Sequence, residues 1–220
     1  MVMLTLSIVL ASAAMAADIH SVDWTVQNQK QLNDSSDLKR QSNNLLKQIL
    51  PNTDIAPIDV GEAAFADIEG NGKLELVATG DWSGRAFYNN VFVVTKKNGK
   101  YSWTSVHGNV FPGPLPERLV DVDGDGRLEL VLENYIDRYE GANRVPLETL
   151  IYSWQKDRFV ENSDAFPFYY RDRVVPKLEQ AWKTLANHPA ASTSTRPRDD
   201  YDEFLARKEL DRAKLRAKMK

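Results

Sequence analysis

Carboxylates at alternate positions around closely spaced glycines are the residues of this chain with the clearest capacity for chemistry. Asp121, Asp123 and Asp125 occupy positions 1, 3 and 5 of one such stretch. The backbone carbonyl of Arg127 falls at position 7 and the carboxylate of Glu129 at position 9. Oxygen ligands at this spacing suit a hard cation such as Ca²⁺, and glycine lets the chain turn without a Cβ clash. The stretch therefore predicts a calcium-binding loop.

A second stretch offers a weaker version of the same ligand set. It provides Asp67, Glu69, Asn71, the carbonyl of Lys73 and Glu75, with one carboxylate replaced by an amide. Carboxylates held close together without a cation repel one another, and calcium would remove that repulsion. We expect two calcium sites, of which the Asp121 loop is the stronger. The alternative for each loop is a solvated acidic turn that binds no metal.

The two loops belong to an internal repeat. Residues 67–77 and 121–131 are identical at seven of eleven positions, and the copies are 54 residues apart. Self-similarity at a fixed spacing is the signature of repeated supersecondary units. We therefore interpret the loops as equivalent parts of two structural units.

Each loop is followed by a pattern that predicts a strand and then a hairpin. The first hairpin runs over 91–104 and turns at Asn98-Gly99, and the second starts at 149 and turns near Lys156-Asp157. Asn-Gly between two β-rich runs is a strong hairpin signal. With a strand before each loop, every unit is predicted to contain four strands.

The same loop motif occurs in EF-hands, but the remainder of that motif is missing here. An EF-hand needs a bidentate Glu at position 12 and a helix on each side. Position 12 is Ala78 in the first loop and Leu132 in the second. The flanking runs, such as 128–132, favour strands. We therefore exclude an EF-hand.

The motif Asp-x-Asp-Gly-Asp-Gly-x-x-Glu-Leu-Val, found once per four predicted strands, resembles the FG-GAP and VCBS-type calcium-binding repeats of integrin-like β-propellers. The resemblance covers roughly residues 55–163. It implies one four-stranded blade per repeat, calcium in each loop, and roles in adhesion or in protein or carbohydrate binding. The expected fold is mainly β with flanking α-helices, an incomplete propeller of two blades. A closed propeller has more blades, so other segments must cover these two.

The segments on either side of the repeats are candidates for that cover. In 17–54, a helix over 37–50 is predicted, capped by Ser35 or Ser36 and stopped by Pro51. In 164–187, the aromatic run 166–170 is expected to dock between the second unit and a helix over 176–187, although a sugar-stacking surface is an alternative. That helix would direct Leu178, Ala181, Trp182 and Leu185 to one face.

The end of the chain reads as a linker and a charged helix. The linker is 188–198. The helix, 199–220, begins acidic and ends basic, and its apolar residues form no continuous stripe. We expect a solvated, frayed tail, with contact to anionic envelope polymers or to a partner as the alternative.

The N-terminus indicates export. Residues 1–16 combine an uncharged apolar run with small residues ending at Ala16, which is typical of a cleaved signal peptide. We therefore expect a secreted or periplasmic protein, with no transmembrane span after the signal. The chain has no cysteine, which excludes disulfides, thiolate metal sites and a cysteine nucleophile. A net charge of −3 gives no case for nucleic acid.

No residue pattern indicates a catalytic site. Gly80-Asp81-Trp82-Ser83-Gly84 lacks the spacing of a nucleophile elbow. The expected function is a non-catalytic interaction or adhesion module that binds a protein or glycan in the cell envelope or outside. The alternatives are a periplasmic inhibitor or immunity-type protein that binds a hydrolase and, less favoured, a hydrolase with dispersed carboxylates. Two copies could also cover their blades by forming a homodimer.

Overall fold

The computed structural model describes residues 18–50, 59–81, 88–110, 114–135, 147–187 and 199–219. The signal peptide predicted for 1–16 and the linker predicted for 188–198 lie outside the described residues. Within the described part of the chain, no helix is long and apolar enough to cross a membrane.

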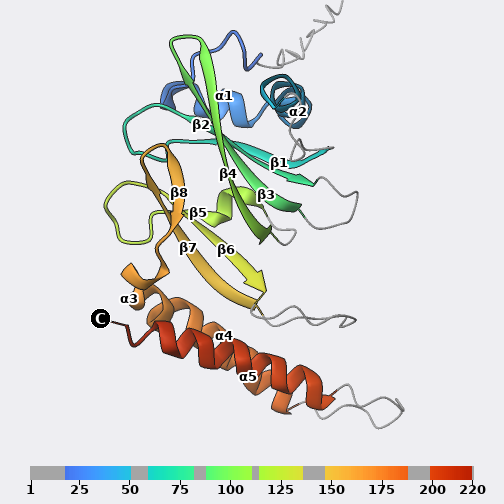
Figure 1. The fold of residues 1–220 in the computed structure, drawn as a ribbon, viewed down its shortest axis with the longest axis vertical. Helices are drawn as coiled ribbons and strands as arrows, with labels where there is room; N and C mark the ends of the chain where they lie inside the picture. The colour runs from blue at the N-terminus through green and yellow to red at the C-terminus, as the bar shows by residue number, and fades with distance from the viewer. Residues whose placement is uncertain are drawn as a thin grey trace, which may run out of the picture.

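Each repeat forms one four-stranded antiparallel sheet, with its strands in chain order (Figure 1). The first sheet contains β1 (Asp59–Ala66), β2 (Glu75–Asp81), β3 (Tyr88–Lys97) and β4 (Lys100–Val110). The second contains β5 (Leu119–Val120), β6 (Glu129–Tyr135), β7 (Leu147–Gln155) and β8 (Arg158–Glu161). The prediction of four strands per repeat is confirmed. The strands on both sides of each acidic loop also confirm that neither loop is an EF-hand.

Both hairpins turn where the sequence placed them. Asn98 and Gly99 have φ of 53° and 74°, and Lys156 and Asp157 have φ of 51° and 62°. Positive φ at both central residues is the geometry of a type I′ turn, whose twist matches that of the flanking strands. The second hairpin achieves this turn without glycine.

The two sheets pack face to face around a shared core. Alternate residues of each strand point to this core, as the two-residue period of a strand requires. The first sheet contributes Ala64, Ala66, Val77, Val91, Val93 and Val106. The second contributes Leu119, Leu130, Leu132, Leu150, Tyr152, Trp154 and Phe159. Because the core is built from both repeats, neither sheet buries this face without the other.

Helices cover the two outer faces, so the molecule is a mixed α/β stack of four layers. Figure 1 shows helices, first sheet, second sheet and helices following one another along the long axis. The described residues form no closed or propeller arrangement, so the expected blades are sheets in a layered sandwich. The physical reason is that the amphipathic flanks bury the faces that further blades would cover in a propeller.

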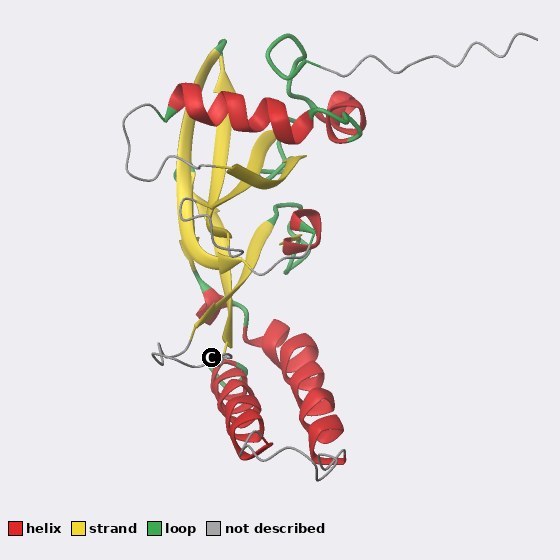
Figure 2. Cartoon of the chain, turned by 90° about the vertical axis from the view of Figure 1, so that its right-hand side faces the viewer, coloured by secondary structure: helices red, strands yellow, loops and turns green. Residues whose placement is uncertain are grey.

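The N-terminal segment covers the first sheet. It contains the 3₁₀ turn η1 (Val26–Asn28), α1 (Gln29–Asn33) and α2 (Leu38–Ile49), of which Figure 2 shows α2 lying across the strands. The predicted cap was wrong, because α2 follows Asp37 and no side chain caps it. Asn33 binds the edge of β1: its Oδ1 accepts the Phe65 N–H at 2.7 Å, and its Nδ2 donates to the Phe65 carbonyl at 3.0 Å.

A helical run covers part of the second sheet. It comprises η3 (Ser163–Ala165), α3 (Pro167–Tyr169), the π-helical turn η4 (Tyr170–Val174) and α4 (Val175–Asn187). Phe166 and Tyr170 are buried against Ile151 of β7, which confirms that the aromatic run docks between sheet and helix. Of the predicted apolar face, Leu178 packs against this cluster and Trp182 is half-buried, whereas Ala181 is exposed. The side chain of Leu185 lies outside the described residues.

The expectation of a solvated tail was wrong. Helix α5 (Asp199–Arg216) packs against α4 and the second sheet, and it buries Ala206, Leu210 and Ala213. These residues recur at helical spacing, but two of them are alanines, whose small side chains make no large apolar stripe in the sequence. Arg216 and Arg212 each lie 3.1 Å from the Glu148 carboxylate of β7.

Candidate metal centre

The Asp121 loop connects β5 to β6 and begins directly after Val120. Gly124 and Gly126 have φ of 78° and 86°. L-residues with a Cβ rarely adopt this left-handed region, so the two glycines allow the chain to reverse within a few residues. The reversal brings side chains from both ends of the loop together.

Three carboxylates converge in this loop. One oxygen from each of Asp121, Asp123 and Glu129 lies within 4.8 Å of the other two. Oxygens that bind a single Ca²⁺ at 2.3–2.6 Å lie within such distances of one another. The structure thus brings together three of the five ligands predicted for this loop.

Backbone N–H groups fix the orientation of these side chains. Asp121 accepts the N–H of Gly124 at 2.7 Å on one oxygen and that of Gly126 at 3.1 Å on the other. Glu129 accepts the N–H of Val122 at 2.9 Å. The carboxylates are therefore held in place by the loop itself.

Glu129 is the buried member of the cluster, with 4% of its surface exposed. Burial raises the pKa of its carboxyl above the ordinary value, the N–H of Val122 opposes this, and the loop aspartates raise the pKa further. A charge held in this environment is costly, and a divalent cation would relieve both the burial and the repulsion.

One predicted ligand, Asp125, is placed differently. The Asp125 carboxylate accepts the Arg127 N–H at 2.8 Å and lies 4.0 Å from the Arg127 guanidinium. Asp125 is not part of the carboxylate cluster. The Arg127 carbonyl as a ligand stays a prediction.

The Asp67 loop repeats two of the backbone bonds of the Asp121 loop, those to the first aspartate from Gly72 and to Glu75 from Ile68, and differs in the third. Asp67 accepts the N–H groups of Asn71 at 2.9 Å and Gly72 at 2.8 Å, and the buried Glu75 accepts that of Ile68 at 3.1 Å. Burial raises the pKa of the Glu75 carboxyl to about 7. The hydrogen bond from Ile68 opposes this rise, and the negative charges of Glu69 and Asp67 add to it.

The interior of the Asp67 loop is filled by hydrogen bonds between its own side chains. The side-chain Nδ2 of Asn71 donates to one Glu69 oxygen at 2.6 Å, and the side-chain Oδ1 of Asn71 accepts the backbone N–H of Lys73 at 2.9 Å. The other Glu69 oxygen accepts the indole N–H of Trp154 at 2.8 Å. Asn71 thus supplies a donor at the point where a cation would be needed, and Lys73 contributes its N–H to this network.

The two loops contact each other directly. The N–H of Leu128 donates to the Ile68 carbonyl at 3.0 Å. A Cβ at Gly70 would lie 2.4 Å from the Gly126 carbonyl oxygen, so only glycine allows this approach. Sequence reasoning missed these contacts and Trp154, because a motif search carries no signal for partners more than 50 residues apart.

The N-terminal segment makes the equivalent contact with the first loop. The N–H of Leu74 donates to the Trp24 carbonyl at 3.0 Å, as Leu128 does to Ile68. Leu74 and Leu128 occupy the same position of the repeat. The Trp24 carbonyl therefore accepts a hydrogen bond from the first loop at the same repeat position as the Ile68 carbonyl does from the second.

Comparison with known proteins adds no further assignment. No family model, no curated protein and no solved structure matches this chain.

Proposed function

We propose that the protein is an exported calcium-binding β-repeat protein that acts as a non-catalytic interaction module. The observation that carries the proposal is the convergence of Asp121, Asp123 and Glu129 within 4.8 Å. The resemblance of the loop to FG-GAP and VCBS-type repeats supports the choice of metal and the class of function.

The ligand chemistry favours calcium over the alternatives. The cluster offers carboxylate oxygens only, and the chain has no cysteine. Hard oxygen ligands on a glycine-rich loop suit Ca²⁺, which tolerates irregular coordination, better than Mg²⁺, which demands near-ideal octahedral geometry. When bound, the cation would neutralise the carboxylates and cross-link the two ends of the loop.

One site is proposed, at the Asp121 loop. In the Asp67 loop the Asn71 amide and the Trp154 indole occupy the oxygens of Glu69. A hydrogen-bonded loop of this kind holds its shape without a cation. The first loop therefore serves as a support for the second, in place of the second calcium site expected from the sequence.

The test is a thermal melt of the protein with calcium, with magnesium and with EDTA. We expect calcium to raise Tm more than magnesium does, with a stabilisation of about 1.4 kcal/mol when free calcium is ten times Kd. Asp123→Ala combined with Asp121→Ala should abolish the calcium response, whereas Glu69→Ala combined with Asn71→Ala should retain it. Identical melting curves with and without calcium would refute the metal site.

A further inference from the structure

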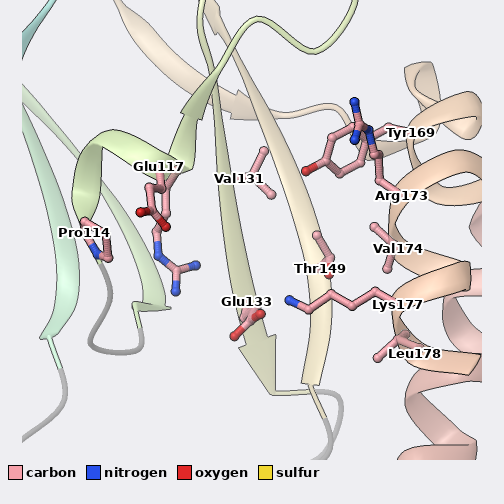
Figure 3. Close-up of a pocket in the computed structure, with 11 residues that line it drawn as sticks. Pro114, Glu117, Val131, Glu133, Thr149, Tyr169, Arg173, Val174, Lys177 and Leu178 are labelled. Carbon is pink, nitrogen blue, oxygen red and sulfur yellow. The ribbon is translucent and has the colours of Figure 1, made fainter. Parts of the chain in front are cut away.

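A cleft of about 280 Å³ lies between the outer face of the second sheet and the helical run that covers it (Figure 3). Its floor consists of Val131 and Glu133 of β6 and Thr149 of β7. Glu133 and Thr149 are paired across the two strands, so their side chains stand on the same face of the sheet. Leu130 and Leu132, which alternate with the floor residues, belong to the core between the sheets. The floor is therefore part of the helix-covered face, and we name this space the Glu133 cleft.

Two walls enclose this floor. One is the 3₁₀ turn η2 (Leu115–Arg118), which contacts β6. The other is formed by η4 and the start of α4, from which Arg173 and Lys177 line the cleft. The hydroxyl of Tyr170 donates to the Thr149 carbonyl at 2.7 Å, so this helical wall is tied to the floor. The cleft is thus formed before any ligand enters, which reduces the cost of binding.

Glu133 is the charged group of the floor. It is half-buried, yet it makes no hydrogen bond and no ion pair with any other described residue. On the neighbouring strand β7, by contrast, the Glu148 carboxylate lies 3.1 Å from two guanidinium groups. A half-buried carboxylate without a donor has lost part of its hydration and gained no hydrogen bond in return. An ammonium group of a ligand would supply the partner that Glu133 lacks.

The helical wall carries two cations. Arg173 and Lys177 are exposed, and neither forms an ion pair within the described ranges. Lys177 extends from α4 toward the floor and Glu133 (Figure 3). On the same helix Glu179 lies 2.8 Å from Lys214, so α4 pairs its charges where a partner is in reach. A carboxylate on the floor and cations on the wall favour a ligand that carries both signs of charge, because each group then gains a partner.

The size and the remaining lining of the cleft limit the ligand further. Val131, Val174 and Leu178 add apolar surface beside the charged groups. An apolar lining with a few polar groups is typical of small-molecule sites, whose volumes are about 300–1,000 Å³. At about 280 Å³ the Glu133 cleft is at the lower end of this range, so it suits a small ligand with an apolar part.

We propose that the Glu133 cleft binds a free α-amino acid with an apolar side chain. The ammonium group of the ligand donates to Glu133. Its carboxylate accepts hydrogen bonds from Arg173 and Lys177, which lie about one helical turn apart. Its side chain lies against Val131 and Leu178. This small-molecule site is additional to the interaction module proposed above, and none of its lining residues belongs to the carboxylate cluster of the Asp121 loop.

Charge argues against other occupants. A simple anion would meet the carboxylates of Glu117 and Glu133 in the same cleft, and a metal cation would meet Arg173 and Lys177. Like charges brought together in this way oppose binding. A residue inside a peptide carries neither terminal charge, and the two termini of a longer peptide belong to different residues. A single amino acid presents both charges on one carbon atom.

The test is a titration of the full protein in EDTA with L-valine, L-leucine and L-phenylalanine, followed by saturation-transfer difference NMR on the ligand. We expect saturable binding of at least one of them with Kd below about 1 mM. The N-acetyl derivative of that amino acid lacks the positive charge, and its amide lacks the negative charge. Each derivative should bind at least about tenfold more weakly, because it leaves a charged group of the cleft without a partner.

Variants assign the two charges of the ligand to the two sides of the cleft. Glu133→Gln should weaken binding of the amino acid about tenfold and remove the difference between it and its N-acetyl derivative. Arg173→Gln combined with Lys177→Gln should instead remove the difference between the amino acid and its amide. The matched control is Arg207→Gln combined with Asp211→Asn on α5, outside the cleft, which should bind as the wild type does.

Three results would overturn this site. They are no saturation by any of the three amino acids up to about 1 mM, N-acetyl derivatives that bind as tightly as the free amino acids, and equal effects of Glu133→Gln and the α5 control. Tighter binding of the N-acetyl derivatives would assign the cleft to simple anions instead. Because the titration is done in EDTA, it is independent of the calcium melts, and the failure of either experiment leaves the other result standing.

Discussion

Gly70 is the residue at which the two repeats come closest. Its φ of 66° is in the left-handed region, and an added Cβ would lie 2.4 Å from the Gly126 carbonyl oxygen. Gly72 also has a positive φ, of 83°, but a Cβ there would meet nothing within 4 Å. The pair separates two effects of glycine, backbone conformation and close approach.

Gly70→Ala should therefore destabilise the protein more than Gly72→Ala does. Both variants bear the left-handed cost of about 1–2 kcal/mol. Gly70→Ala adds the displacement of the second loop, for which overpacking costs typically 1–3 kcal/mol. Urea unfolding in EDTA measures the difference, and equal losses of stability would show that the loops do not press on each other at this point.

The Glu75 carboxyl gives the metal-free protein a pH-dependent stability. Its pKa in the folded state is about 7, above the ordinary 4.5, so the folded state binds the proton more tightly. This stabilisation, roughly 3 kcal/mol, is complete below pH 4.5 and is lost as the pH rises through 7. Gln does not ionise, so the Glu75→Gln variant does not lose this stabilisation. Its free energy of unfolding relative to that of the wild type should therefore rise between pH 5 and about 8. Urea midpoints in EDTA that run parallel for both proteins would contradict this.

At the scale of elements, local signals predicted the hairpins and loops well. Asn98-Gly99 and the glycines of the acidic loops specify their turns through a few adjacent residues. The position of α5 could not be predicted in this way, because it depends on alanines and on carboxylates of distant strands. The Trp154 bond to Glu69 joins residues 85 apart and decides which loop suits a metal, yet no local pattern encodes it.

The docking of α5 depends on a half-buried ion-pair network. Glu148 lies 3.1 Å from both Arg212 and Arg216, and its side chain is 12% exposed. Glu148→Gln leaves both guanidinium groups without this charge and should cost about 1–3 kcal/mol. Glu179→Gln, which removes an exposed pair with Lys214, should cost less than about 1 kcal/mol. Chemical denaturation of the two variants tests the contrast, and similar losses would mean that α5 is held by its apolar contacts alone.

At the scale of the whole molecule, one core is shared by both repeats. Residues of every strand from β1 to β8 line the contact between the sheets. Unfolding of either sheet would expose the inner face of the other, so partial unfolding is unfavourable. We expect a single transition, with coincident midpoints by tryptophan fluorescence and by far-ultraviolet circular dichroism. Two separated midpoints would show that the repeats unfold independently.

The bonds between loops also give the array a direction. Leu128 donates to Ile68 and Leu74 donates to Trp24, so the donor always belongs to the later segment and the acceptor to the earlier one. The N-terminal segment is therefore the first member of this series. A third unit could join only after the second loop, at the position of Val122. There the chain changes to another structure, because Val122 packs against the cluster of Phe166 and Tyr170. The aromatic run therefore covers the second repeat where a third repeat would attach.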